Sequence, residues 1–215
     1  MRVINCPNNW EYTQHANYNV LPTRCKSALV NLRSNPLNRR IPSDTRDIHL
    51  FLFTQLTPPD VPYFAGNYRG SNHTCLKFYE VTIPSDIRVG SKCPHVNLDI
   101  QNLAQVLEEG LRALDIADNV PAETLSEEDK VYFLVSFACR IFVEFLRVHP
   151  YANGNGHIAR YIIWAILGRY GIWPKKWPMN DRPPDPPYSD LISKYRDGDK
   201  DPFEEFVLKC VTGQI

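Results

Sequence analysis

The chain has 215 residues, which is enough for one well-buried domain and too few for two large ones. Its 24 Lys and Arg residues balance 24 Asp and Glu residues, so there is no overall basic field of the kind that drives nonspecific nucleic-acid binding. Hydrophobic residues make up 43% and charged residues 22%, which excludes a disordered or collagen-like chain. We expect a folded protein without nucleic acid as a partner.

Neither a signal peptide nor a membrane span is visible. The stretch MRVINCPNNWEY at the start has no apolar core, and the longest apolar run, YIIWAIL, is far shorter than the roughly 20 residues of a membrane helix. We therefore expect a soluble, cytoplasmic protein with no membrane partner. The cysteines show no C-x-x-C pair and no zinc-site spacing, so they are interpreted as reduced thiols. They are Cys6, Cys25, Cys75, Cys93, Cys139 and Cys210.

The amino-terminal part is predicted to be an irregular arm, residues 1 to about 21, followed by helices. A first helix is expected at about 23 to 33. A second follows the segment PSDTRDIHLFLFTQLTPP, where Ser43 or Asp44 can cap free N–H groups and Pro58 stops the run. We expect residues 1–60 to pack on a core formed by residues 61–215, as a single domain overall.

A β-hairpin is predicted within KFYEVTIPSDIRVGSKC, residues 77 to 93, because β-branched and aromatic residues alternate with polar ones around a Pro-Ser-Asp turn. Helical spacing returns at 97 to 114. The strongest helix pattern covers 126 to 148, which Thr124 or Ser126 can cap and which acidic residues favour at its start. This helix is expected to be buried on several sides and central to the core.

The rest of the chain is also predicted to be helical. An apolar helix is expected at 156 to about 170, and two short helices near 188 to 196 and 202 to 211 follow the Pro-rich loop WPKKWPMNDRPPDPPY. The expected fold class is therefore mainly α, a helical bundle with one β-hairpin.

The stretch HPYANGNGHIAR, residues 149 to 160, places polar and turn-forming residues between two strongly apolar segments. Pro150 and the two glycines, Gly154 and Gly156, interrupt a helix, so a turn is expected here. A Gly-Asn-Gly turn that leads into a helix leaves backbone N–H groups unpaired at the positive end of the helix dipole. Such a turn favours an anion, and phosphate is the natural ligand.

Three side chains in this stretch can add chemistry to the turn. Asn155 offers an amide donor, and Arg160, one turn into the helix, offers a guanidinium fork to phosphate. His149 lies at the other end, where a neutral imidazole can take a proton from an attacking hydroxyl.

Simpler interpretations apply to the same residues. A Gly-Asn turn commonly just connects helices, His149 can be a packed or capping residue, and Arg160 can neutralise a nearby carboxylate. The spacing of His149, Asn153 and His157 would align metal ligands on a helix, but the glycines and the proline remove that helix. A Walker-type phosphate loop is excluded because no G-x-x-x-x-G-K-[ST] occurs in the chain.

Taken as a whole, the stretch resembles the signature of the Fic family, H-P-F-x-[D/E]-G-N-G-R-x-x-R. The outright matches are His149, Pro150, Gly154, Asn155, Gly156 and Arg160, and Tyr151 keeps an aromatic ring in place of Phe. The resemblance extends less sharply from about 63 to 210. FAGNYRG is similar to the segment before the family's flap, the hairpin expected around 78 to 92 to the flap itself, and YRDGDKDPFEEFV to the closing helices. The family fold implied is mainly helical, with one β-hairpin flap that aligns a target side chain.

The resemblance implies a protein adenylyltransferase that moves AMP from ATP, with Mg²⁺ or Mn²⁺, to a Ser, Thr or Tyr hydroxyl of a target protein. By position, His149 is the catalytic base, and Arg160 binds the terminal phosphate. The nucleotide phosphates lie on Gly154, Asn155 and Gly156. Gly156 favours adenylyl transfer, because the Doc-like branch has lysine there and binds its nucleotide the other way round to act as a kinase.

Two positions depart from the family pattern. Asn153 stands where Asp or Glu holds Mg²⁺, and a neutral amide is a poorer ligand, so Asn153 is a weak metal candidate. His157 replaces a phosphate-binding arginine and carries charge only at lower pH. We therefore expect reduced activity. The segment nearest to the family's inhibitory motif is QVLEEG, in which Gln105 replaces Ser or Thr and Glu109 is interpreted as solvent-facing, so restraint is expected from an inhibitory partner protein or from the altered motif itself.

Three functions therefore stand side by side. The first is an adenylyltransferase, the second a nucleotide- or protein-binding module that keeps the fold without transfer, and the third a transferase that uses another donor, such as UTP or a phosphocholine-carrying nucleotide. A toxin, a secreted effector and a housekeeping regulator are all compatible with the sequence.

Overall fold

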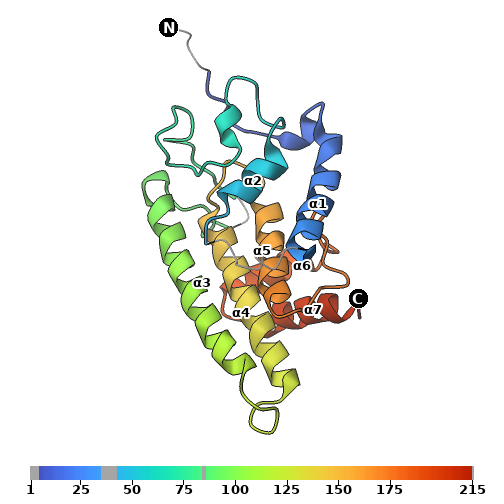
Figure 1. The fold of residues 1–215 in the computed structure, drawn as a ribbon. Coiled ribbons are helices and arrows are strands. Elements are labelled where there is room, and N and C mark those ends of the chain that lie inside the picture. Colours follow the sequence, from blue (N-terminus) through green and yellow to red (C-terminus); the bar gives the residue numbers. More distant parts are fainter. Residues whose placement is uncertain (1–4, 35–42, 84–85, 215) are drawn as a thin grey trace.

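The computed structural model describes residues 5–34, 43–83 and 86–214. Helices dominate these ranges, and the mainly α class is confirmed. Seven α-helices are present in the described residues: α1 Leu21–Ser34, α2 Arg46–Phe53, α3 Val96–Asp118, α4 Glu127–Val148, α5 Asn155–Arg169, α6 Tyr188–Arg196 and α7 Asp201–Thr212 (Figure 1). Short 3₁₀ turns lie at Tyr12–Gln14, Tyr18–Val20, Pro62–Phe64 and Cys93–His95.

The starts of two helices agree with the capping residues read from the sequence. Ser126 precedes α4, and its hydroxyl oxygen accepts the Asp129 N–H at 3.1 Å. Asp44 precedes α2, and its carboxylate accepts the Arg46 N–H at 2.9 Å. Each side chain satisfies one N–H group that has no partner within the helix.

The two longest helices, α3 and α4, lie side by side as an antiparallel pair joined by the loop at one end of the molecule (Figure 1). Gly110 lies at their contact, where an added Cβ would meet the Phe137 ring at 2.0 Å. The glycine therefore allows the two helix backbones to come close together, although it lowers helix propensity.

The most deeply buried helix is α5, and α4 is central to the core as expected. Every residue of α5 from His157 to Gly168 is buried, whereas Tyr132 and Phe133 in the first half of α4 are about half exposed. A helix that is apolar on all sides needs neighbours on all sides. Helices α1 and α4 pack against α5, and α4 in turn contacts α3, α6 and α7. The start of α5 is therefore held rigidly within the core.

The predicted β-hairpin is not supported. The described residues of that segment, 77–83 and 86–93, contain no strand, and its Pro84-Ser85 turn lies outside the described residues. The polar backbone groups of the two arms have other partners. The Gly90 and Ser91 N–H groups donate to the last carbonyls of α4, those of Arg147 and Val148, at 2.9 and 3.0 Å. The carbonyls of Tyr79 and Ser91 both accept from one buried guanidinium. These bonds replace a strand ladder.

The interpretation of all six cysteines as reduced thiols is wrong for two of them. Cys6 and Cys75 form a disulfide across a sequence separation of 69 residues, which ties the amino-terminal arm to the segment before Tyr79. Cys25, Cys93, Cys139 and Cys210 are free and buried, and Cys139 is packed inside α4 as expected. The sequence spacing carried no signal for the pair because the two residues meet only through the fold.

One hydrophobic cluster runs from Trp10 in the arm to Val211 in α7. Side chains from residues 1–60 and from residues 61–215 thus share a core within the described part of the chain. Among the helices that are described, none combines the length and the apolar character required to cross a bilayer.

Candidate functional site

The stretch 149 to 160 forms a tight loop between α4 and α5. His149 ends α4 in the left-handed conformation, with φ 53°, and its N–H donates to the Phe145 carbonyl at 3.0 Å. Gly154 starts α5 with φ 80°, and an added Cβ there would meet the Phe53 ring at 2.4 Å. Glycine is therefore required at 154 both by the backbone and by the neighbouring ring.

Asn155 closes the loop with its side chain. The amide oxygen accepts the Tyr151 N–H and the amide nitrogen donates to the Tyr151 carbonyl, both at 2.9 Å. Asn155 is 2% exposed, so its side-chain amide stabilises the loop. Any contact of Asn155 with phosphate comes through its backbone N–H group. The N–H groups of Asn155 and Gly156 open α5, where the helix offers them no partner, and they point toward the same end of the helix.

Two residues of the preceding elements support the loop from behind. The Tyr151 hydroxyl pairs with Thr45 at 2.7 Å, and the Tyr151 ring stacks on His49 with centroids 3.7 Å apart. His49 accepts the Gly66 N–H at Nδ1 and donates from Nε2 to the Asn153 carbonyl at 3.0 Å. Burial lowers the pKa of His49 to about 3, so the ring is neutral. Sequence reasoning missed His49, and its only signal was a histidine inside the apolar run of α2.

His149 has the orientation of a proton acceptor. Its Nδ1 lies 3.3 Å from the Leu146 carbonyl, which places the ring proton on Nδ1 and leaves Nε2 with a free lone pair. Burial, together with the positive charges of Arg69 and Arg196, lowers the pKa of His149 to about 4. The imidazole is therefore neutral at pH 7.

Arg69 is a fully buried cation that holds the base and the neighbouring segment together. Its guanidinium donates to the carbonyls of His149 at 2.8 Å and Val148 at 3.2 Å, and also to those of Ser91 at 3.0 Å and Tyr79 at 3.2 Å. Its backbone N–H donates to the Pro150 carbonyl at 2.8 Å. The sequence alone gives Arg69, within FAGNYRG, no role.

Arg160 lies in the first turns of α5 and is 3% exposed. Its Nε donates to the Met179 carbonyl at 3.1 Å and its Nη2 to the Asn180 carbonyl at 3.2 Å. The remaining nitrogen, Nη1, faces Gly156, because a Cβ added to that glycine would lie 3.1 Å from it. No carboxylate of the described residues forms an ion pair with Arg160, so the interpretation of Arg160 as the neutraliser of a nearby acid finds no partner in this part of the chain.

His157 is 6% exposed and lies between two rings, those of Tyr12 and Phe53, with both centroids at 5.7 Å. Its Nδ1 is 3.4 Å from the Tyr12 hydroxyl. Its Nε2 is buried and has no hydrogen-bond partner within the described structure, as is also true of Asn180 Oδ1 nearby. Burial, together with the charge of Arg160, lowers the pKa of His157 to about 3. His157 thus brings no charge to the site at pH 7.

The amide of Asn153 is engaged at both ends. Its Nδ2 donates to the Trp10 carbonyl at 2.5 Å, and its Oδ1 accepts the Gly154 N–H at 2.7 Å. The described residues contain no cluster of three His, Cys, Asp or Glu side chains that could hold a metal ion. A neutral oxygen that already accepts a hydrogen bond fits Mg²⁺ poorly.

A cleft of about 890 Å³ opens beside these residues. The loop contributes His149, Gly156 and Arg160, the arm contributes Tyr12, and Asp86 and Arg196 of α6 also line the cleft. Asp86 and Arg196 form an ion pair at 2.9 Å, which ties the segment after residue 85 to α6. A space of this size accommodates a nucleotide.

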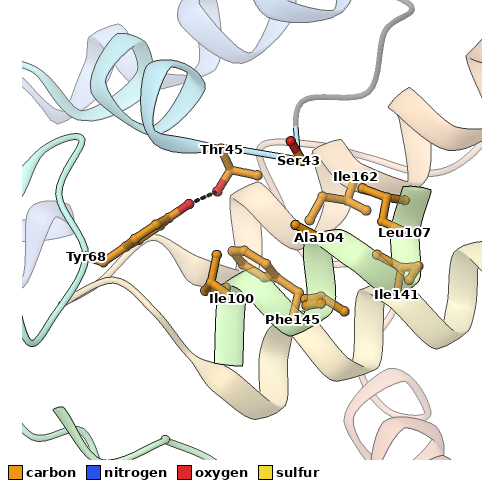
Figure 2. Close-up of a pocket in the computed structure, with 10 residues that line it drawn as sticks. Ser43, Thr45, Tyr68, Ile100, Ala104, Leu107, Ile141, Phe145 and Ile162 are labelled. Atoms are coloured by element: carbon orange, nitrogen blue, oxygen red, sulfur yellow. Dashed lines mark hydrogen bonds between the residues drawn. The ribbon is translucent and has the colours of Figure 1, made fainter. Parts of the chain in front are cut away.

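A second, much smaller space lies where Thr45 and Tyr68 face apolar residues of α3, α4 and α5 (Figure 2). Its volume of about 20 Å³ suits a single water-sized group and is too small for a substrate. Glu109 lies away from both spaces, exposed on α3 and bonded to Gln105 at 2.8 Å, as expected for a solvent-facing carboxylate.

No protein-family model matches the chain. Over 91 residues the chain is 31% identical to a protein adenylyltransferase Fic of Nematostella vectensis. This stretch makes up 42% of the chain and 21% of the relative, so the chain spans about a fifth of the length of the curated relative it matches. The similarity supports the resemblance to the Fic family that the stretch 149 to 160 carries.

Proposed function

We propose that this chain is a Fic-type nucleotidyltransferase that moves AMP from ATP to a Ser, Thr or Tyr hydroxyl of a target protein. Three things support the proposal: the 31% identity to a protein adenylyltransferase Fic, the signature residues, and the arrangement of the cleft. The cleft brings together a neutral histidine, the start of a rigid helix and a buried cation.

The observation that carries the proposal is the environment of Arg160. A buried positive charge is costly unless an anion or a full set of acceptors compensates it. Arg160 has two backbone carbonyls as partners, and its Nη1 faces the start of α5, where the N–H groups of Asn155 and Gly156 also lack helical partners. All these groups favour one anion in the same place, and a phosphate of the nucleotide would supply it.

The reaction that follows from this arrangement needs one proton acceptor. His149 Nε2 takes the proton of the target hydroxyl, and the oxygen forms a bond to the α-phosphorus of ATP. The bond from that phosphorus to the bridging oxygen breaks, and pyrophosphate leaves. Arg160 and the backbone N–H groups bind phosphate oxygens and stabilise their charge. The residues described around the loop fit Mg²⁺ poorly.

Transfer is tested by incubating the protein and a cell lysate with an ATP analogue labelled on its α-phosphate or its adenosine. We expect labelled protein, and loss of at least a hundredfold of the label with His149→Ala. His95→Ala is the matched control, since His95 is exposed in a 3₁₀ turn and its side chain caps nothing. Equal labelling by wild type and His149→Ala would refute the proposal. Because the pKa of His149 is about 4, the rate should persist down to pH 5.

Experiments with the same protein and lysate also distinguish the two alternatives, a binding module without transfer and a transferase that uses another donor. The binding module is favoured if the protein binds ATP, Arg160→Gln abolishes this binding, and no protein becomes labelled. Arg112→Gln is the control, because Arg112 is exposed on α3. A mass increase on the target that differs from that of AMP identifies another donor.

A further inference from the structure

The two positions that depart from the Fic signature, Asn153 and His157, contact the same piece of chain. Asn153 donates its amide N–H to the Trp10 carbonyl, and His157 lies 3.4 Å from the Tyr12 hydroxyl. Trp10 and Tyr12 belong to the amino-terminal arm, whose docked part is formed by residues 9 to 14. Asn153 and His157, which lie four residues apart, thus contact Trp10 and Tyr12, which lie two residues apart.

The arm is held firmly at this place. All three polar groups of Trp10 are bonded: its N–H to the Tyr79 hydroxyl at 3.0 Å, its indole N–H to the Leu56 carbonyl at 2.9 Å, and its carbonyl to Asn153. The ring is 2% exposed. The disulfide of Cys6 attaches the chain just before it. The arm is therefore fixed to the rest of the protein, and its residue Tyr12 lines the cleft.

The family's own residues would not make these contacts. An ionised carboxylate at 153 has no hydrogen to donate, so it would face the Trp10 carbonyl as a second acceptor. An arginine at 157 would place a long guanidinium in the buried space that the imidazole shares with the Tyr12 and Phe53 rings. Asn and His fit the docked arm, whereas Asp or Glu and Arg do not.

We propose that the arm docks on Asn153 and His157 in place of the metal and phosphate contacts that these positions otherwise make, so that the cleft binds nucleotide phosphates without a divalent cation. The binding of nucleotide phosphates rests on the proposed function, whereas the docking of the arm rests on the arm contacts alone. The cationic charge for the phosphates then comes from Arg160 and the start of α5.

Docking is tested by hydrogen exchange of the arm in Asn153→Asp. The variant replaces the donor to the Trp10 carbonyl with a repelling acceptor, so this hydrogen bond is lost. We expect the amides of residues 9 to 14 to exchange at least tenfold faster. Asn97→Asp adds the same charge at an exposed position in the first turn of α3 and should leave the arm unchanged. Equal exchange of the arm in Asn153→Asp and wild type would overturn the docking.

The role of the cation is tested by calorimetric titration of ATP in EDTA and in Mg²⁺. We expect the wild-type Kd to agree within threefold between the two buffers, and Asn153→Asp to bind at least tenfold tighter in Mg²⁺ than in EDTA. Tenfold tighter binding by wild type in Mg²⁺ would overturn the inference. In that case Glu11→Gln tests whether the arm supplies the ligand, because Glu11 is the arm carboxylate that lines the cleft.

The two proposals fail differently. Absence of ATP binding in both buffers overturns the proposed function together with the cation-free binding, and the exchange experiment alone then decides whether the arm docks. ATP binding without Mg²⁺ and without transfer supports the inference and overturns only the transferase.

Discussion

Arg69 offers the sharpest test of how the site is built. Replacing it with Met removes the four side-chain bonds to the carbonyls of His149, Val148, Ser91 and Tyr79. The His149 and Ser91 carbonyls are then left without a donor, whereas the Val148 carbonyl keeps the Ser91 N–H and the Tyr79 carbonyl keeps the Cys93 thiol. Each buried carbonyl left without a donor costs about 1–3 kcal/mol, so the sum for two is about 2–6 kcal/mol. This is a large part of the 5–15 kcal/mol by which a domain is typically stable, so we expect Arg69→Met to be strongly destabilised in urea denaturation.

Arg69→Lys keeps the charge but not the planar fork, and a compact ammonium cannot span four carbonyls that belong to two segments. We expect it to lose about 2 kcal/mol of unfolding free energy, measured by urea denaturation. Arg112→Lys is the control and should change stability by less than about 0.5 kcal/mol, because Arg112 is exposed. A loss below about 0.5 kcal/mol for Arg69→Lys would refute the reasoning.

Three further predictions concern pH, the disulfide and the phosphate space. The folded pKa values of His49 and His157 are about 3 and their unfolded values about 6.5, so the unfolded chain binds more protons below pH 6.5 and each ring should cost about 2 kcal/mol of stability at pH 5. Urea denaturation with equal midpoints at pH 7 and pH 5 would contradict this. Denatured, unreduced protein should show four reactive thiols, since Cys6 and Cys75 are paired, and the Cys6→Ser, Cys75→Ser double variant should lose about 4 kcal/mol or less of unfolding free energy. Six thiols would rule out the pair. Gly156→Ala should stay within about 1 kcal/mol of wild type in urea and bind ATP about tenfold more weakly, because its Cβ lies 3.1 Å from the guanidinium that faces it. Unchanged ATP affinity would show that the phosphates lie elsewhere.

Most of the helices could be predicted from the sequence because their signals are local. Ser126 and the acidic residues after it mark the start of α4, and the apolar period continues to Val148. Gly154 and Gly156 interrupt the helical pattern, so α5 was expected to begin beside them. Caps, breakers and periodicity act within one or two turns, which is why the boundaries agree to within a few residues.

The segment 77 to 93 shows where local reasoning stops. Its alternation of β-branched, aromatic and polar residues is typical of a hairpin, but strand pairing depends on whether the backbone groups find each other or another partner. Here Arg69 and the end of α4 take those groups, so contacts from outside the segment decide its conformation.

The sequence by itself determined the mainly helical class and the turn at 149 to 160, together with the residues that can act there, because these depend on neighbours along the chain. Only the tertiary structure decided that His49 and Arg69 hold the loop, that Cys6 pairs with Cys75, and that Asn153 engages Trp10. Each of these contacts joins residues more than 60 positions apart. No local pattern encodes such a contact, because its partners meet only after the helices have packed.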